Sequence, residues 1–155
     1  MKKQLISLLL GLLLVPIFAY SQIPAIEAEQ TPTYCPSPDK LVKNGLWWHV
    51  DNSWKSYSES FVEKVTDFIE VQWIGVKVGT VICLYKGKDE FDFPVALEPT
   101  YPMTVLAPTG SAWQTTKEDY KKCVSNNVQD CPFYQQKKAT TADLYEQIKY
   151  RGKKD

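Results

Sequence analysis

Residues 56–69, SYSESFVEKVTDFI, carry the apolar pattern on which the choice of fold class depends. Apolar side chains stand at positions i, i+4, i+7 and i+8, the spacing of one helix face: Phe61, Val65, Phe68 and Ile69. Charged side chains occupy the opposite face: Glu59, Glu63, Lys64 and Asp67. Ser56 and Glu59 have the spacing of a capping box, which favours a helix start at Ser56. The stretch therefore predicts an amphipathic helix.

The segments on either side of this stretch carry strand patterns. Residues 45–54 predict a hairpin with a turn at 51–53, in which Leu46, Trp48 and Val50 share one face. The β-branched run 78–85 predicts a buried strand, and residues 91–97 alternate as its return strand, which the later prolines place at an edge or end early. A short strand at Trp113 and a helical turn over 117–123 follow. We therefore expect an α+β fold, a small antiparallel sheet with one packed amphipathic helix.

The N-terminus has the features of a secretory signal. Met1-Lys2-Lys3 precedes an apolar run of 14 residues from Leu5 to Phe18, which is shorter than the about 20 residues of a membrane span. Small residues at Ala19 and Ser21 predict cleavage before Gln22. We expect a periplasmic protein of a Gram-negative bacterium, with no stable insertion in the membrane after cleavage.

The domain organisation follows from this leader and from composition. We expect a cleaved signal peptide at 1–21, a flexible arm at 22–33, a single α+β domain at 34–134 and a polar, basic tail at 135–155. A frayed helix over Ala142–Tyr150 is an option within the tail. The whole chain has 18 basic and 18 acidic residues, which excludes the strongly basic footprint of a general nucleic-acid binder.

The four cysteines predict two disulfides, because an even number in an exported chain is typical of an oxidised framework. They are Cys35, Cys83, Cys123 and Cys131. The turn sequence 125–127 favours closure of Cys123 with Cys131, which leaves Cys35 for Cys83, although the crossed pairings stay open. A zinc site is disfavoured because the chain has no C-x-x-C or H-x-x-x-H pair.

No catalytic, metal or cofactor site is expected. The single histidine, His49, has Asp51 and Ser53 near it in sequence, but three neighbours on one hairpin cannot converge on one substrate atom. The acidic cluster at 89–92 lacks the ligand spacing of a calcium loop. We therefore expect a protein that is not an enzyme.

Crowded aromatic residues are the strongest candidate interaction site. Five of them fall within 27 residues: Trp47, Trp48, Trp54, Tyr57 and Trp73. Because alternation prevents all five from sharing one core face, some must be exposed or covered by another chain. Exposed tryptophan and tyrosine often anchor protein interfaces.

Spaced single residues between 34 and 133 resemble a known family. The frame is Tyr34-Cys35-Pro36-Ser37-Pro38, Gly45-x-Trp47, Trp54-Lys55-Ser56-Tyr57, Gln72-Trp73-x-Gly75, Gly79-x-x-x-Cys83-x-Tyr85, Phe93-Pro94-Val95, Trp113, Cys123 and Asp130-Cys131-Pro132-Phe133. It is similar to the EirA-like family of small exported proteins associated with the Dot/Icm (type IVB) secretion system. The resemblance implies a periplasmic accessory protein that acts through protein contacts, and it brings no catalytic or cofactor residue.

Two functions remain in competition at this stage. The first is a non-enzymatic periplasmic protein that supports effector secretion, with secretion-system or other periplasmic proteins, or further copies of itself, as partners and with no nucleic acid. The alternative is an extracytoplasmic domain that binds or hydrolyses glycans, which the tryptophans and acidic side chains would serve.

Overall fold

The computed structural model describes residues 31–89, 93–101 and 103–136, together with Thr141 and Tyr145. The predicted signal peptide, nearly all of the arm, Phe91 and most of the tail lie outside these residues. The fold is one antiparallel sheet, and between residues 31 and 136 the described part of the chain contains two short 3-10 helices and no α-helix. The expected α+β architecture with a packed helix is therefore wrong.

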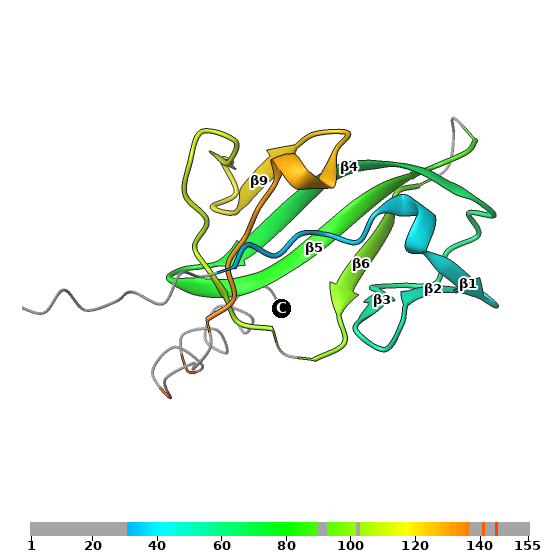
Figure 1. The fold of residues 1–155 in the computed structure, drawn as a ribbon, viewed down its shortest axis with the longest axis horizontal. Helices are drawn as coiled ribbons and strands as arrows, with labels where there is room; N and C mark the ends of the chain where they lie inside the picture. Colours follow the sequence, from blue (N-terminus) through cyan, green and yellow to red (C-terminus); the bar gives the residue numbers. More distant parts are fainter. Residues whose placement is uncertain (1–30, 90–92, 102, 137–140, 142–144, 146–155) are drawn as a thin grey trace, which may run out of the picture.

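Nine strands form the sheet in the order β1-β2-β3-β6-β5-β4-β9-β8, with β7 paired to β5 beside this path (Figure 1). Their bounds are β1 Val42–Asn44, β2 Trp47–Val50, β3 Trp54–Ser56, β4 Val65–Gly75, β5 Val78–Gly87, β6 Val95–Pro99, β7 Val105–Leu106, β8 Gln114–Thr115 and β9 Lys121–Val124. The 3-10 helices are η1 Pro38–Lys40 and η2 Val128–Asp130.

The long β4–β5 hairpin is the centre of the molecule. Its tip brings Gly75 opposite Gly79, where the two strands approach closely. A Cβ atom at Gly79 would lie 2.2 Å from the Ile74 carbonyl oxygen, so the close approach requires glycine. The β-branched run at 78–85 forms β5, as the sequence predicts.

The predicted helix at 56–69 is divided between β3, an irregular segment and β4. Ser56 lies in β3, where its Oγ accepts a hydrogen bond from the Trp48 backbone N–H at 3.1 Å instead of capping a helix. In β4 the register against β5 shifts between Val65 and Asp67 and again between Phe68 and Glu70. Each bulge adds one residue, so Val65, Phe68 and Val71 are buried at intervals of three. The two bulges therefore give the buried residues of this strand a spacing close to that of one helix face.

The hairpin at 45–54 is confirmed as β2 and β3, which pair Val50 with Trp54 across the turn at 51–53. A further strand, β1, pairs with β2 through a turn at Gly45, whose φ of 61° suits glycine. β6 begins at Val95 and ends at Pro99, but it lies inside the sheet between β3 and β5. The helical turn expected over 117–123 is wrong, because Lys121–Val124 pairs with β4 as β9.

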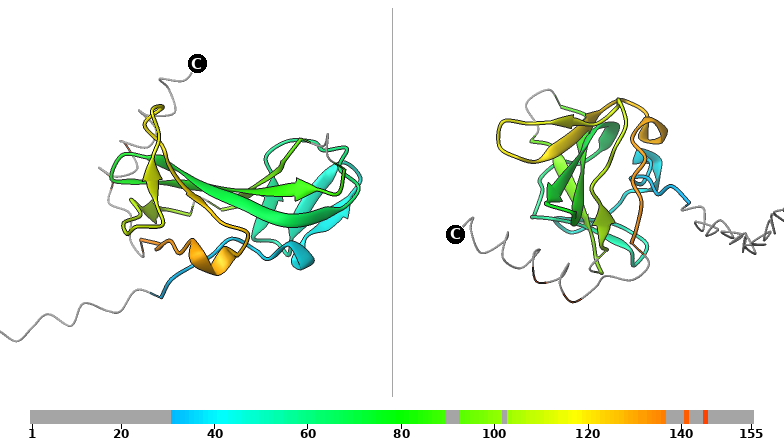
Figure 2. Two further views of the ribbon diagram at one scale, coloured as in Figure 1. Left: turned by 90° about the horizontal axis from the view of Figure 1, so that it is seen from above. Right: turned by 90° about the vertical axis from the view of Figure 1, so that its left-hand side faces the viewer.

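Two segments from opposite ends of the domain form a second layer over one face of the β4–β5 hairpin (Figure 2). Thr33 and Phe133, one from each segment, form an isolated antiparallel bridge. The side chain of Phe133 is fully buried. The Tyr85 hydroxyl of β5 donates to the Pro36 carbonyl oxygen at 2.7 Å. Burial of Tyr85 raises the pKa of its hydroxyl above the usual value.

The structure contains the two disulfides that the cysteine spacing favours. Cys35–Cys83 joins the N-terminal segment to β5, and Cys123–Cys131 joins β9 to the segment that follows η2. All four cysteines are buried. Two disulfides indicate that the chain folds in an oxidising environment outside the cytoplasm. We call β4, β5 and the covering segments 33–37 and 127–136 the stapled core.

Candidate functional site

The structure separates the five aromatic residues that the sequence nominates into two groups. Trp48, Trp54 and Trp73 are buried in the core. Trp47 is 44% exposed and Tyr57 is 64% exposed, so these two are accessible to a partner. Trp73 is held inside by a hydrogen bond from its Nε1 to the Val105 carbonyl oxygen at 3.1 Å. The predicted surface therefore keeps two of its five members.

Two phenylalanines that the sequence assigns to buried faces are the most exposed aromatic residues of this region. Phe61 is 82% exposed and Phe93 is 89% exposed. Phe61 lies in the irregular segment between β3 and β4, and Phe93 lies two residues before β6. The signals that would have placed them outside are local: serines at 58 and 60 precede Phe61, and Pro94 interrupts the alternation after Phe93.

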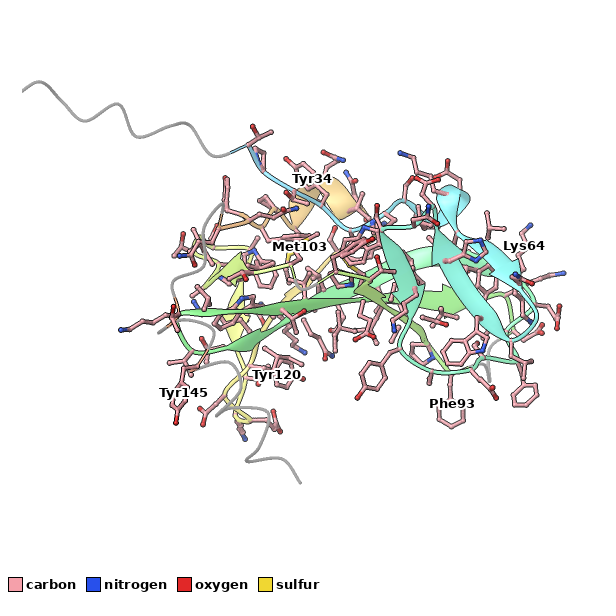
Figure 3. The ribbon with its side chains drawn as sticks, turned by 90° about the horizontal axis from the view of Figure 1, so that it is seen from below. Tyr34, Lys64, Phe93, Met103, Tyr120 and Tyr145 are labelled. Carbon is pink, nitrogen blue, oxygen red and sulfur yellow. A yellow bond between two sulfur atoms is a disulfide. The ribbon has the colours of Figure 1, made fainter. Side chains whose placement is uncertain are left out.

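These side chains come from segments that the sheet brings to one end of the molecule. β1, β2 and β3 lie at that end, and the segment after β3 is fixed there by a hydrogen bond from the Ser60 N–H to the Leu46 carbonyl oxygen at 2.8 Å (Figure 1). Phe93 projects from the same end, away from the sheet (Figure 3). We call this surface, made of Trp47, Tyr57, Phe61 and Phe93, the aromatic end.

Phe61 and Phe93 line the same groove of about 200 Å³. Residues 58–62 form one wall and residues 93–96 form the other. The wall residues are small or apolar apart from Glu59, which is the one ionisable side chain among the described lining residues. In the segment that follows this wall, Glu63 forms an ion pair with Lys43 of β1 at 3.0 Å.

A larger groove of about 480 Å³ follows the N-terminal segment of the stapled core. Its lining includes Tyr34, Lys40, Asp51 and Trp54. Asp51 is the one carboxylate among the described lining residues, so this groove does not present the two flanking carboxylates that a glycosidase uses.

The remaining candidate residues do not assemble into a reactive centre in the described part of the chain. His49 is half-buried in β2, whereas Asp51 and Ser53 are exposed in the following turn, and no hydrogen bond joins the His49 side chain to either in the described structure. No group of three or more histidine, cysteine, aspartate or glutamate side chains is arranged to hold a metal ion among the residues described.

The described residues include no helix with the length and hydropathy that crossing a membrane requires. No family model, curated protein or solved structure matches this chain in comparisons with known proteins.

Proposed function

We propose that this chain is a non-enzymatic periplasmic interaction protein that works through its aromatic end. The observation that carries this proposal is the exposure of four aromatic side chains at one end of the molecule, two of which, Phe61 and Phe93, line one groove, in contrast to the buried Phe68, Trp73 and Tyr85 of β4 and β5. Isolated exposed apolar residues are ordinary, but a group of large ones at one place is typical of an interaction site.

The scaffold beneath the aromatic end supports a role in recognition. Trp48 and Trp54 anchor β2 and β3 from inside, while Trp47 stands on the outer side of β2. Backbone pairing of β3 with β6 connects this end to β5, which carries the Cys35–Cys83 disulfide. A surface held in one arrangement loses less conformational entropy on binding, which favours affinity.

The finer proposal is that the partner belongs to a Dot/Icm-like (type IVB) secretion system. Its support is the resemblance of the residue frame between 34 and 133 to the EirA-like family, together with an N-terminus typical of an export signal. In this proposal the protein assists effector delivery by contact and has no substrate of its own.

In-cell crosslinking tests both levels of the proposal. A photoreactive amino acid introduced at Tyr57 of the exported protein should trap a periplasmic protein in the native bacterium. The double variant Phe61→Ala with Phe93→Ala should weaken the affinity for the partner by at least about thirtyfold, because anchor residues contribute about 2 kcal/mol or more. Both the crosslink and effector delivery into host cells should therefore decrease. Tyr101→Ala is the matched control, since Tyr101 is 76% exposed but does not line the groove.

Three other results would change or contradict the proposal. A crosslinked protein outside the secretion apparatus would retain the interaction role and remove the Dot/Icm assignment. Normal effector delivery and unchanged crosslinks in the double variant would contradict the interaction role of the aromatic end. Reproducible binding to a glycan array that Phe93→Ala abolishes would favour the glycan-binding alternative.

A further inference from the structure

The ladder between β3 and β6 opens at a proline. Trp54–Ser56 pairs with Leu97–Pro99, and the Tyr57 N–H still donates to the Ala96 carbonyl oxygen at 2.8 Å. Since residues of an antiparallel strand face alternate neighbours, the next residue directed to this side is Pro94. Pro94 has no N–H, so the ladder cannot continue there. The chain after Tyr57 turns toward Leu46 instead.

This opening creates the groove and leaves one edge available. In the described part of the chain, no strand pairs with residues 93–94 on the side that faced β3. The alternation directs the Pro94 carbonyl oxygen to this edge, where it can accept a hydrogen bond from an added strand. Extended peptides bind exposed edges in this way, with main-chain hydrogen bonds for affinity and neighbouring pockets for specificity.

The volume of the groove indicates the size of what enters it. At about 200 Å³ it is smaller than the roughly 300–1,000 Å³ of a small-molecule site. A side chain from an extended segment that passes over it fits this scale.

The walls determine which side chain is favoured. Phe61 and Phe93 both line the groove and are mostly exposed, and the face of an aromatic ring attracts cations. Glu59 adds a carboxylate to the lining. No other ionisable side chain lines the groove among the described residues, since Glu63 of the same segment is paired with Lys43 outside the lining. Both the rings and the local charge therefore favour a cation and oppose an anion.

We propose that the groove binds an extended protein segment that carries a lysine or arginine side chain. The main chain of the segment pairs with the edge of β6 at Pro94, and the cationic side chain lies between Phe61 and Phe93 near Glu59. This inference rests on the proposed function, since it gives the chemistry of the partner that the aromatic end contacts.

A membrane surface is the competing occupant, because exposed aromatic side chains also insert into lipid interfaces. The Glu59 carboxylate in the lining of the groove opposes contact with anionic lipid, whose surface potential is negative. We therefore expect no binding to vesicles that contain anionic phospholipid.

The test uses the disulfide-bonded protein purified from the periplasm and a phage-displayed library of random dodecapeptides. Enriched peptides should contain lysine or arginine next to β-branched residues. Replacement of the basic residues of the best peptide by norleucine should weaken binding about tenfold in fluorescence anisotropy. Phe93→Ala and Glu59→Gln should each weaken binding of the basic peptide, with Glu59→Gln leaving the norleucine peptide unaffected.

Two control variants make this result specific. Tyr101→Ala removes an exposed aromatic ring outside the groove, and Asp51→Asn removes an exposed carboxylate in a turn whose left-handed backbone asparagine also adopts. Both should bind within about twofold of the wild-type protein. Thermal melts of all four variants should match the wild type, because every replaced side chain is exposed.

The inference is overturned by failure to enrich peptides, by enriched peptides without basic residues, or by Phe93-dependent binding to anionic vesicles. Its failure is distinguishable from failure of the proposed function. If Phe61→Ala with Phe93→Ala abolishes the in-cell crosslink while the library shows no preference for basic residues, the interaction role stands and the occupant proposed here is wrong.

Discussion

The stapled core and the aromatic end use the same residue types for opposite purposes. In the stapled core, Phe68 is 2% exposed and packs edge-to-face on Tyr85 with ring centroids 5.8 Å apart. At the aromatic end, Phe61 lies seven residues earlier in the chain and is 82% exposed. The Cys35–Cys83 disulfide lies within the stapled core, and the Cys123–Cys131 disulfide joins it to β9. The difference teaches that a phenylalanine supports the fold only where the sheet buries it, so Phe61 is available for contact with another molecule.

Charge substitution should separate the two regions most strongly. Phe68→Asp should unfold the protein, since it removes a buried ring and buries a charge without a partner, at a cost of more than about 5 kcal/mol. Phe61→Asp should change the free energy of unfolding by less than about 0.5 kcal/mol. Urea denaturation of both variants measures this contrast, and equal losses would contradict the exposed position of Phe61.

The two disulfides should differ in their contributions. Cys35 and Cys83 are 48 residues apart, whereas Cys123 and Cys131 are 8 apart. In the chain-entropy model the longer loop contributes about 4 kcal/mol and the shorter one about 2.5 kcal/mol. Paired cysteine-to-alanine variants should follow this order in urea denaturation. A larger loss of stability on removal of the Cys123–Cys131 disulfide would contradict this order.

The tip of the β4–β5 hairpin should be intolerant of a methyl group. Gly79→Ala should cost about 1–3 kcal/mol, because the added Cβ would overlap the Ile74 carbonyl oxygen. Gly45→Asn in the β1–β2 turn is the matched control, since Gly45 has open space around it and asparagine tolerates a positive φ. Thermal melts should show a loss for Gly79→Ala and little change for Gly45→Asn.

Alkaline titration should report on the contact between β5 and the N-terminal segment. Burial raises the pKa of Tyr85, so its stabilising contribution is complete below about pH 10, the pKa of an unfolded tyrosine, and falls as the pH rises further. Tyr85→Phe should cost about 1–2 kcal/mol at neutral pH, because the Pro36 carbonyl oxygen loses its donor. Its stability should also fall less steeply above pH 10, and an unchanged slope would assign the alkaline transition to other groups.

Local patterns predict the parts of this fold that local interactions determine. The strand at 78–85 and the hairpin at 45–54 have strong β-branched or alternating sequences, and both form. The helix prediction fails because Thr66 and Ile69 are extra residues in two β-bulges. These bulges arise from the register in which β4 pairs with β5. Such pairing is not encoded in the spacing of β4 alone.

Local sequence patterns predict only part of the candidate site. Alternation correctly places Trp47 and Trp48 on opposite sides of β2. It misplaces Phe93, because Pro94 ends the regular strand before the alternation reaches it. The groove itself depends on the separation of residues 58–62 from residues 93–96, more than thirty positions apart in sequence, and no local pattern predicts that separation.

The bridge between Thr33 and Phe133 has a topological consequence. It brings residues 33 and 133, near the two ends of the described range 31–136, side by side on the side of the molecule opposite to β1, β2 and β3 (Figures 1 and 2). A short linker could therefore join residue 136 to residue 31, and new termini could be opened elsewhere in a circular permutant. A fluorophore or a solid support attached at residue 31 or residue 136 would likewise lie away from β1, β2 and β3 and leave the groove accessible.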